Sequence, residues 1–491
     1  MIVWKEHARR WISIFKTILF SAAVIFTVIL FQNGSARALS ASEWQTVAGA
    51  IDAFIDAQYD DNGTPGDLSD DPYSGEAGFF INATELKTRL DSNGDNAFLS
   101  EGDDAANTPV LVDVYGGSTR IPGTSYFTGN YANATDTTKA PAVAQLVNNH
   151  RSAGLSDEII TYCLTGHWGS LVMFNYGAMA HAGYFGSPVP TVRVLKWARL
   201  GWSGSVGAPN YNTFNKPYTA TPVATPGPYS LATTTSCNGV SPDAELVRCR
   251  ANATGSIITG GSDPWAISLD AGRQPVDVRT AVDYYMADNS GNPYSYNLPF
   301  ATLFDATGGT YDNLAKLNPG TSKVIMLHGR TPISGHMAAQ GTLMLGYNAR
   351  ALRFGLPMWS GLNPPGWEEK WVSNPAYPYT STAIDVTAPT ITVAPTASNI
   401  TSSSADISRT AGEPATMKVE YGTTSGVYTN TVNNTILNAN KTVALNSLDE
   451  YTTYYVKVTS YDGQANGTAS SEYSFTTSDV TAPSITNLAP T

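Results

Sequence analysis

The chain has 491 residues and a formal net charge of −12 at pH 7. This length is too great for a single hydrophobic core and predicts about two to four domains. The acidic balance argues against nucleic acid or an anionic membrane as the main partner, because binding phosphate requires a basic surface. An apolar fraction of 42% with abundant aromatic residues excludes a disordered chain.

Residues 1–38 are predicted to direct export. A basic segment that ends at Lys16 is followed by the uncharged apolar run TILFSAAVIFTVILF at 17–31. Ala36 and Ala38 then give the small-x-small pattern of a signal-peptidase site and favour cleavage after Ala38. An uncleaved anchor is the alternative, although the run is shorter than the roughly 20 residues of a spanning helix. We therefore expect an exported protein, either periplasmic or extracellular at the cell surface.

Two acidic loops lie near the start of the next region. The segment 90–104 has oxygen-bearing side chains at alternating positions: Asp91, Asn93 and Asp95. Calcium-binding loops space their oxygen ligands in this way, and Asp103 stands where a further ligand would be needed. The segment 59–71 is acidic but has no fixed spacing. We predict a structural calcium site at 90–104, with a solvated acidic turn as the alternative.

The residues around Cys163 predict a strand, a tight turn and a helix. The apolar segment that ends at Tyr162 is typical of a buried strand, and the apolar stripe over 169–184 is typical of a helix. Cys163 therefore stands at a strand-to-helix turn. In open parallel sheets, ligands bind at this carboxyl end of the strands.

This turn is suited to activating a thiol. Successive N–H groups in a glycine-containing turn and the positive end of a helix both stabilise an anion, so they lower the pKa of a thiol. The alternatives are an inert buried residue at a strand end and half of a disulfide between two chains. The predicted anion-binding loop consists of Leu164, Thr165, Gly166, His167 and Trp168.

Four segments of 80–204 resemble, in order, the motifs of the rhodanese family of sulfurtransferases. PVLVDVYGG resembles the Val-Leu-Val-Asp-Val-Arg strand, with Asp113 in register and Tyr115 in place of Arg. TRIPGT resembles the His-Ile-Pro-Gly-Ala segment, with Arg120 in place of His. IITYCLTGHWGS resembles the active-site loop, and VRVLKWARLGWSG resembles the closing strand. The resemblance implies that 39–205 is an α/β domain with a parallel sheet and flanking helices.

The resemblance also implies an activity. Cys163 would take sulfane sulfur from a polysulfide, thiosulfate or a protein persulfide, carry it as a persulfide and pass it to a thiol acceptor, with no cofactor required. The loop has no Arg or Lys, and His167 is its one chargeable residue. A polysulfide or a protein persulfide is therefore a better predicted donor than thiosulfate.

A connection rich in Pro, Thr and Ser spans 206–240, and residues 241–375 return to α/β texture. Cys237 and Cys249 flank a short polar segment. In an oxidising compartment this pair is predicted to form a disulfide, which leaves Cys163 without an obvious partner in the chain.

Residues 322–361 repeat the pattern of the first copy, with Gly335-His336 parallel to Gly166-His167. The segment PVDVRTAVDYY at 275–285 matches the Asp-Val-Arg motif through Asp277 and Arg279. The second α/β domain is thus predicted to be a rhodanese-like copy, again with a parallel sheet and flanking helices.

No cysteine follows the strand of the second copy, which ends at Leu327-His328. This copy is therefore predicted to be degenerate and unable to form a persulfide. His328 and Arg330 are candidates for a domain interface that faces the first site. The alternative is that both are ordinary loop residues.

Residues 385–478 carry short alternating segments between turns, which is typical of an all-β immunoglobulin-like sandwich. LNSLDEYTTYYVKV resembles the Leu-x-Pro-x-Thr-x-Tyr segment of fibronectin type III domains, with Glu450 in place of Pro. Tyr454 would be the tyrosine-corner residue, and Arg409 stands near the expected core Trp. The resemblance implies a module that spaces, tethers or binds a protein or cell-surface partner.

The segment DVTAPTIT at 385–392 recurs as DVTAPSIT at 479–486. Residues 479–491 are therefore interpreted as the start of a further repeat or a linker, in a sequence that is a fragment or ends early. A coincidental tail is the alternative.

Two functions compete. The first is an exported sulfurtransferase of the rhodanese type that works through Cys163. The second is a non-catalytic extracellular binding or scaffold protein built from the same modules, favoured by the missing basic residue and the degenerate copy. Reactivity of the Cys163 thiol distinguishes them.

Overall fold

The structure is a computed structural model. It describes residues 39–59, 77–115, 119–127, 137–163, 167–196, 198–203, 228–232, 237, 239–252, 258–259, 273–279, 296–306, 311–320, 324–329, 332–352 and 384–481. The predicted export signal at 1–38, nearly all of the acidic segment 59–71 and most of the connection 206–240 lie outside these residues. Within them, no helix is both long enough and apolar enough to cross a membrane.

The first α/β unit is built on a parallel sheet with the strand order β1-β5-β4-β2-β3. Its strands are β1 (Phe80–Ile81), β2 (Val110–Asp113), β3 (Tyr126–Phe127), β4 (Ile159–Tyr162) and β5 (Val192–Leu195). β2 and β4 are buried at every position, which explains their nearly continuous apolar sequences. Because neighbouring strands are parallel, the carboxyl ends of β2, β4 and β5 lie at one edge of the sheet.

Six helices accompany this sheet: α2 (Ala41–Gln58), α3 (Ala83–Leu90), α4 (Ala140–Ala153), α5 (His167–His181), α6 (Ala198–Ser203) and α7 (Asp243–Asn252). α2 begins with a capping box, in which Ser40 and Glu43 satisfy each other's backbone N–H groups. α4 ends at Gly154, whose left-handed φ of 71° suits glycine. The 3₁₀ helices are Ala77–Phe79, Ala105–Asn107, Thr137–Lys139 and Leu314–Lys316.

The second α/β unit has a parallel sheet with the order β6-β10-β9-β7-β8. Its elements are β6 (Ile258–Thr259), β7 (Arg273–Asp277), β8 (Tyr296–Asn297), α9 (Phe300–Leu303), β9 (Val324–His328), α10 (Pro332–Met344) and β10 (Ala349–Leu352). Replacing each strand of the first sheet by the strand five later gives this order. The predicted internal repeat is therefore present in the topology.

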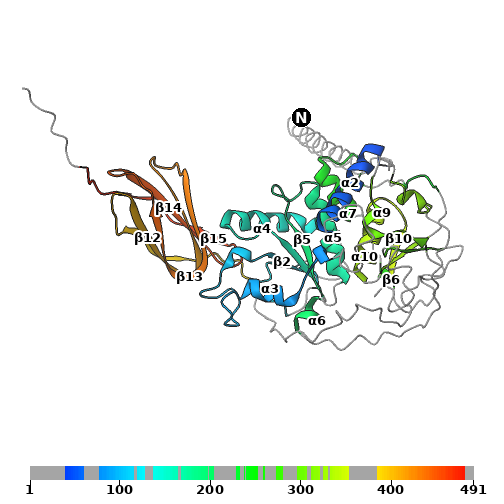
Figure 1. Ribbon diagram of the computed structural model, residues 1–491, viewed down its shortest axis with the longest axis horizontal. Coiled ribbons are helices and arrows are strands. Elements are labelled where there is room, and N and C mark those ends of the chain that lie inside the picture. The colour runs from blue at the N-terminus through cyan, green and yellow to red at the C-terminus, as the bar shows by residue number, and fades with distance from the viewer. Residues whose placement is uncertain are drawn as a thin grey trace, which may run out of the picture.

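The two units share one hydrophobic core, and α2, α5, α7 and α10 lie between the two sheets (Figure 1). The rings of Phe54 on α2 and Phe174 on α5 are 5.8 Å apart, edge to face. Gly177 lets α2 approach α5, since a Cβ at that position would lie 2.2 Å from the ring of Phe54. Across the units, the Gln340 amide donates to Asn175 Oδ1 at 2.6 Å.

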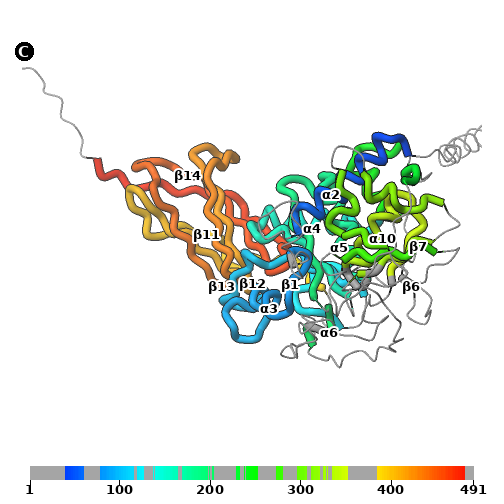
Figure 2. The backbone as a smooth tube through the Cα atoms, turned by 45° about the vertical axis from the view of Figure 1, so that its right-hand side comes forward, coloured from blue at the N-terminus to red at the C-terminus, as the bar shows by residue number. Residues whose placement is uncertain are grey.

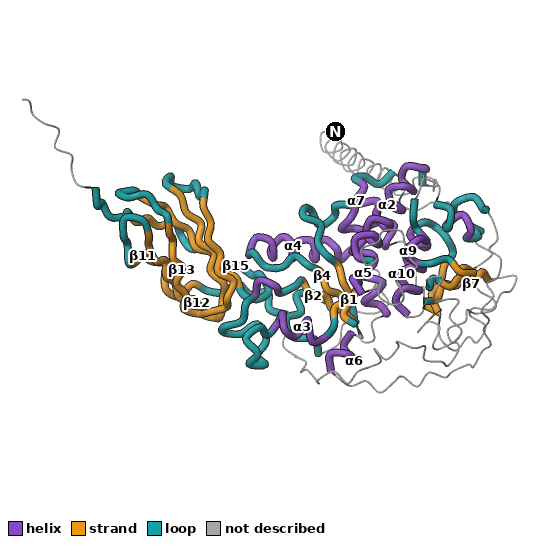
Figure 3. Tube along the Cα trace, in the orientation of Figure 1, coloured by secondary structure: helices purple, strands orange, loops and turns teal. Residues whose placement is uncertain are grey.

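An antiparallel β-sandwich forms a separate lobe, drawn in orange to red in Figure 2 and rich in strands in Figure 3. Its strands are β11 (Ile391–Ser398), β12 (Ser404–Gly422), β13 (Asn430–Asn446), β14 (Thr453–Tyr461), β15 (Gly467–Ala469) and β16 (Tyr473–Thr476). β12 pairs with β11, β13 and β14, and β14 also pairs with β15 and β16. The sequence thus predicted the antiparallel β-rich character of this region and both parallel sheets.

Two residues singled out in the sandwich sequence have defined contacts. The Tyr454 hydroxyl accepts the N–H of Asp449 at 2.9 Å, which is a tyrosine corner. Arg409 is buried, and its guanidinium donates to the carbonyls of Asn438, Ala439, Ala415 and Thr416. This arginine therefore binds irregular backbone where β12 and β13 shift register.

Candidate active site

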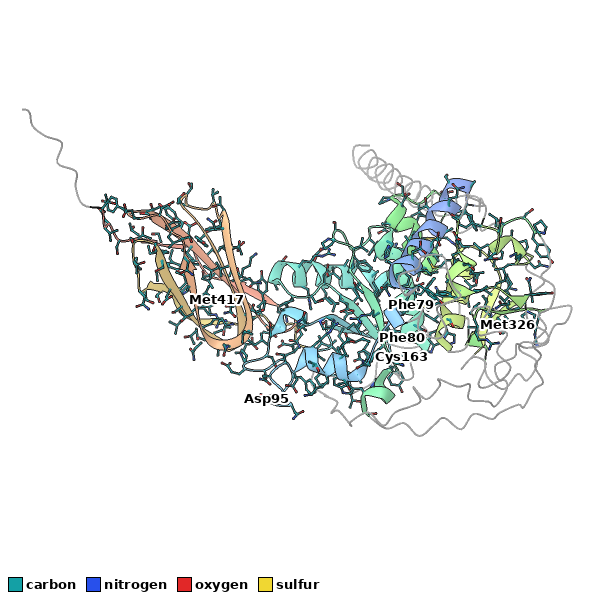
Figure 4. The ribbon with its side chains drawn as sticks, viewed as in Figure 1. Phe79, Phe80, Asp95, Cys163, Met326 and Met417 are labelled. Atoms are coloured by element: carbon teal, nitrogen blue, oxygen red, sulfur yellow. A yellow bond between two sulfur atoms is a disulfide. The ribbon has the colours of Figure 1, made fainter. Side chains whose placement is uncertain are left out.

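Cys163 directly follows β4, the central strand of the first sheet, and its side chain is buried (Figure 4). α5 begins four residues later at His167. Of the predicted anion-binding loop, Leu164, Thr165 and Gly166 lie outside the described residues, and His167 is described only by its place in the helix. Trp168 is partly buried against the core. The predicted strand before the cysteine and the predicted helix after it are thus both present.

The first turn of α5 packs closely against the end of β4. A Cβ at Gly169 would lie 3.3 Å from Tyr162 Cα and 3.4 Å from Cys163 N, so glycine allows this approach. The Thr161 hydroxyl also donates to Gly169 O at 2.8 Å. Because a helix N-terminus carries a partial positive charge, this arrangement favours an anion near Cys163.

The loop after β2 is fastened to β4 through buried side chains. The Tyr162 hydroxyl lies 2.7 Å from Thr124 Oγ1 and accepts the N–H of Ile121 at 3.3 Å. Burial raises the pKa of Tyr162 well above its usual value, so the phenol stays neutral. Asp113, buried at the end of β2, accepts the N–H of Tyr115 at 2.8 Å.

Arg199 is the residue of this edge that sequence reasoning missed. Its backbone N–H donates to Cys163 O at 3.1 Å, from α6, which follows β5. Its buried guanidinium donates to Thr119 and lies 5.2 Å from the centre of the Tyr115 ring. Arg199 lies outside the loop after Cys163, which was the segment predicted to supply the charged group. The end of the neighbouring parallel strand was the signal that would have found Arg199.

Sheet register identifies the residue that stands in place of Cys163 in the second unit. Asp113 pairs with Tyr162 in the first sheet, and Asp277 pairs with His328 in the second. Gly329 therefore corresponds to Cys163. A Cβ at Gly329 would lie 2.2 Å from Ser334 Oγ, so a larger residue there requires the Ser334 side chain to move.

This register corrects one predicted correspondence. Gly335-His336 lies inside α10, whereas Gly166-His167 stands at the start of α5, so the two pairs are not equivalent. The physical reason is that Gly335 lies six residues beyond Gly329, inside α10, whereas Gly166 lies only three residues beyond Cys163. Of the predicted interface pair, Arg330 and the side chain of His328 lie outside the described residues.

Asp277 and Arg279 do belong together in the second unit. They form a buried ion pair, with Arg279 Nη2 2.6 Å from Asp277 Oδ2. The amide of Asn297 donates to the carbonyl oxygens of both residues. In the predicted Asp-Val-Arg motif, the arginine therefore neutralises the aspartate at the end of β7.

The acidic loop at 90–104 directs its carboxylates at N–H groups. Asp91 accepts from the backbone of Gly94 at 2.8 Å and Asn96 at 3.0 Å, and lies 2.6 Å from Lys87 Nζ. Burial raises the pKa of Asp91, but Lys87 and the N–H groups outweigh it and the net shift is downward.

The other two carboxylates of the predicted calcium site, those of Asp95 and Asp103, have different surroundings from the carboxylate of Asp91. Asp103 accepts from the N–H groups of Asn93 at 3.1 Å and Ser100 at 2.7 Å. Asp95 lies exposed at the outer tip of the loop (Figure 4). In the part of the chain that the structure describes, no cluster of three or more His, Cys, Asp or Glu is arranged to hold a metal ion. The calcium site stays a prediction that this geometry does not support.

Cys237 and Cys249 form a disulfide with a Cα–Cα distance of 5.8 Å. It ties the end of the connection to α7. Cys163 is the one cysteine outside this bond.

No protein-family model matches the chain, and no curated protein matches it. Solved structures match about a fifth of it. A fibronectin type III domain of the human protein KIAA0970 is 20% identical and covers 20% of this chain and 81% of its own, with a TM-score of 0.15. The domain of human fibronectin type III domain containing protein 3 is 18% identical and covers 21% and 97%, with a TM-score of 0.17.

Proposed function

We propose that the first α/β unit is a sulfurtransferase of the rhodanese type, in an exported protein, with Cys163 as the sulfur carrier. The observation that carries this proposal is the place of Cys163: it follows the central parallel strand and precedes the N-terminus of α5. The four sequence motifs that resemble the rhodanese family support it. The second unit, which has Gly329 at this position, serves as a structural partner.

The proposed reaction has two exchanges of sulfur–sulfur bonds. The Cys163 thiolate attacks the outer sulfur of the donor, a new S–S bond forms, and the donor's own S–S bond breaks to release a thiolate or, from thiosulfate, sulfite. An acceptor thiolate then attacks the outer sulfur of the Cys163 persulfide. It leaves as a persulfide and restores the Cys163 thiolate, so no external oxidant or reductant is needed.

Two features favour an anionic donor. The N-terminus of α5 and the Arg199 guanidinium both place positive charge at the edge of the sheet where Cys163 lies. We propose that they attract the negative end of a polysulfide or of thiosulfate. Arg199 thus weakens the sequence-based argument against thiosulfate, which counted only the loop after Cys163.

The burial of Cys163 favours the second candidate, a non-catalytic extracellular scaffold or binding protein. Its relative exposure is 0%, so a donor can reach the thiol only after a local movement. In this candidate the α/β units are a platform, and the sandwich meets a protein or cell-surface partner.

The decisive measurement is the mass of the native protein after incubation with polysulfide. We expect one added sulfur on wild-type protein, removable by dithiothreitol, and none on Cys163→Ser. Iodoacetamide labelling without denaturant provides the control for access. If the thiol is alkylated but gains no sulfur from polysulfide, thiosulfate or a protein persulfide, the sulfurtransferase proposal fails. If the thiol resists alkylation as well, the scaffold is favoured.

A further inference from the structure

Residues 98–105, which we call the joint loop, connect the first α/β unit to the sandwich. The N–H of Gly102 donates to Leu437 O at 2.7 Å, and the N–H of Leu437 donates to Asp103 O at 2.7 Å. Asp104 and Ile436 form an antiparallel bridge. β13 therefore pairs with β12 inside the sandwich and, through its middle, with the joint loop.

Acidic side chains of the joint loop strengthen this pairing. Glu101 accepts the N–H of Ala439 at 3.0 Å, and Asp104 accepts the Thr435 hydroxyl at 2.7 Å. Part of the acidic segment that suggested calcium thus binds donors of β13. The acidic side chains of this segment therefore stabilise the contact between the joint loop and β13.

Apolar contacts complete the joint. The backbone of the β14–β15 turn approaches the loop so closely that a Cβ at Gly463 would lie 2.9 Å from Leu99 Cβ. Leu99 and Tyr461 pack around the buried cluster, which consists of Ala105, Ala153, Leu155, Leu437 and Ala465. A joint with backbone pairing and a buried apolar cluster holds the sandwich in a fixed position.

The other side of the joint loop contacts α6, the helix that is hydrogen-bonded to the backbone of Cys163. The ring of Phe98 lies 5.7 Å from that of Trp202, which is buried on α6. The same short helix carries Arg199, whose N–H donates to Cys163 O at 3.1 Å. A continuous series of contacts therefore runs from the sandwich through Leu99 and Phe98 to α6 and Cys163.

We propose that docking of the sandwich holds the joint loop and α6 in place, and so controls how often the buried Cys163 thiol becomes exposed. Phe98 and Leu99 are positioning residues in this device. Undocking lowers the free energy needed to open α6 locally, because the joint loop loses its contacts on one side. This inference concerns access to the thiol and does not depend on sulfur transfer.

The test is the alkylation rate of Cys163 by iodoacetamide in the full, native chain. The other two cysteines are joined in a disulfide, so Cys163 is the thiol that reports. Leu437→Asp places a charge in the joint cluster and is expected to speed alkylation roughly two- to thirtyfold. Val427→Asp is the matched control, because the Val427 side chain is 52% exposed, and its rate is expected to equal that of wild type.

Hydrogen exchange at the backbone amides shows whether each variant undocks the sandwich or leaves it docked. In Leu437→Asp, the Gly102 and Leu437 amides are expected to lose protection while β12 and β14 keep it. Phe98→Ala cuts the contact with α6 and leaves the sandwich docked, so it is expected to raise the rate with those two amides protected. If the joint amides exchange freely and alkylation stays at the wild-type rate, the proposal is wrong. If Leu437→Asp unfolds the sandwich, the Phe98→Ala rate decides, and a wild-type rate there overturns the proposal.

Discussion

The two α/β units have the same strand order but close the end of their second strand differently. In the second unit, Asp277 is neutralised by Arg279 two residues later. In the first, Tyr115 takes that place, and the nearby cation is Arg199, which reaches over the Tyr115 ring from α6. In the second unit the positive charge belongs to the same short motif as the carboxylate. In the first unit it comes from α6, the helix that is hydrogen-bonded to Cys163.

The positions that directly follow the central strands β4 and β9 also differ between the two units. Cys163 lies four residues before α5, whereas the space beside Gly329 is occupied by Ser334. The second unit therefore has glycine at the position of Cys163, with Ser334 packed against it. The comparison suggests one unit with a site and one unit that supports it.

The largest expected effect comes from moving the cysteine. Gly329→Cys, made in the Cys163→Ser background, is expected to gain no sulfur from polysulfide, because the new side chain meets Ser334. Mass spectrometry of the native variant checks this. Sulfur uptake at the new cysteine would show that the two turns are equivalent and would break the comparison.

Asp277→Asn tests the ion pair of the second unit. The substitution leaves the Arg279 charge buried without its counter-ion, so the free energy of unfolding is expected to fall by about 3–5 kcal/mol. Urea denaturation followed by tryptophan fluorescence measures this change. The double variant Asp277→Leu/Arg279→Met serves as control and should recover much of the loss. A single variant as stable as wild type contradicts the structural role of the pair.

His150, buried on α4, gives the first unit a dependence on pH. Burial lowers its pKa from 6.5 to about 4, so the unfolded chain binds a proton before the folded one does. Stability is therefore expected to be full above about pH 6.5 and to decline as the pH falls towards 4, by about 3 kcal/mol in all. Urea unfolding at about pH 7 and about pH 4.5 measures this, and His150→Leu should flatten the profile. An unchanged slope in His150→Leu would assign the pH dependence to other groups.

The smallest expected effect is that of Arg199→Gln, which tests the charge of the first site. Loss of one charge-assisted contact is expected to slow sulfur uptake from thiosulfate about tenfold, with a smaller effect for a neutral organic trisulfide. Single-turnover kinetics with both donors measure the difference, and Arg199→Lys should restore part of the rate. Equal losses for the two donors would indicate a structural role for Arg199.

Local sequence was enough to predict the elements around Cys163. The apolar run before it and the stripe after it have the periods of a buried strand and a helix, and both form. Tyr454 likewise makes the predicted corner contact, because that contact is only five residues away along the chain.

Contacts between distant segments were beyond this kind of prediction. Arg199 reaches Cys163 because two strands are neighbours in space, and the joint loop meets β13 more than 300 residues later in the sequence. The alternating carboxylates at 90–104 match a calcium loop in spacing, but spacing does not reveal that Lys87 and backbone N–H groups already bind them.

The contact between α5 and α10 has an evolutionary consequence. Asn175 and Gln340 join the helices that follow the two central strands, and the aromatic core extends across both units. After a duplication, a copy that loses its chemistry is normally free to decay. Here the second unit supplies a wall of the first unit's interior, so selection for folding alone is enough to retain it.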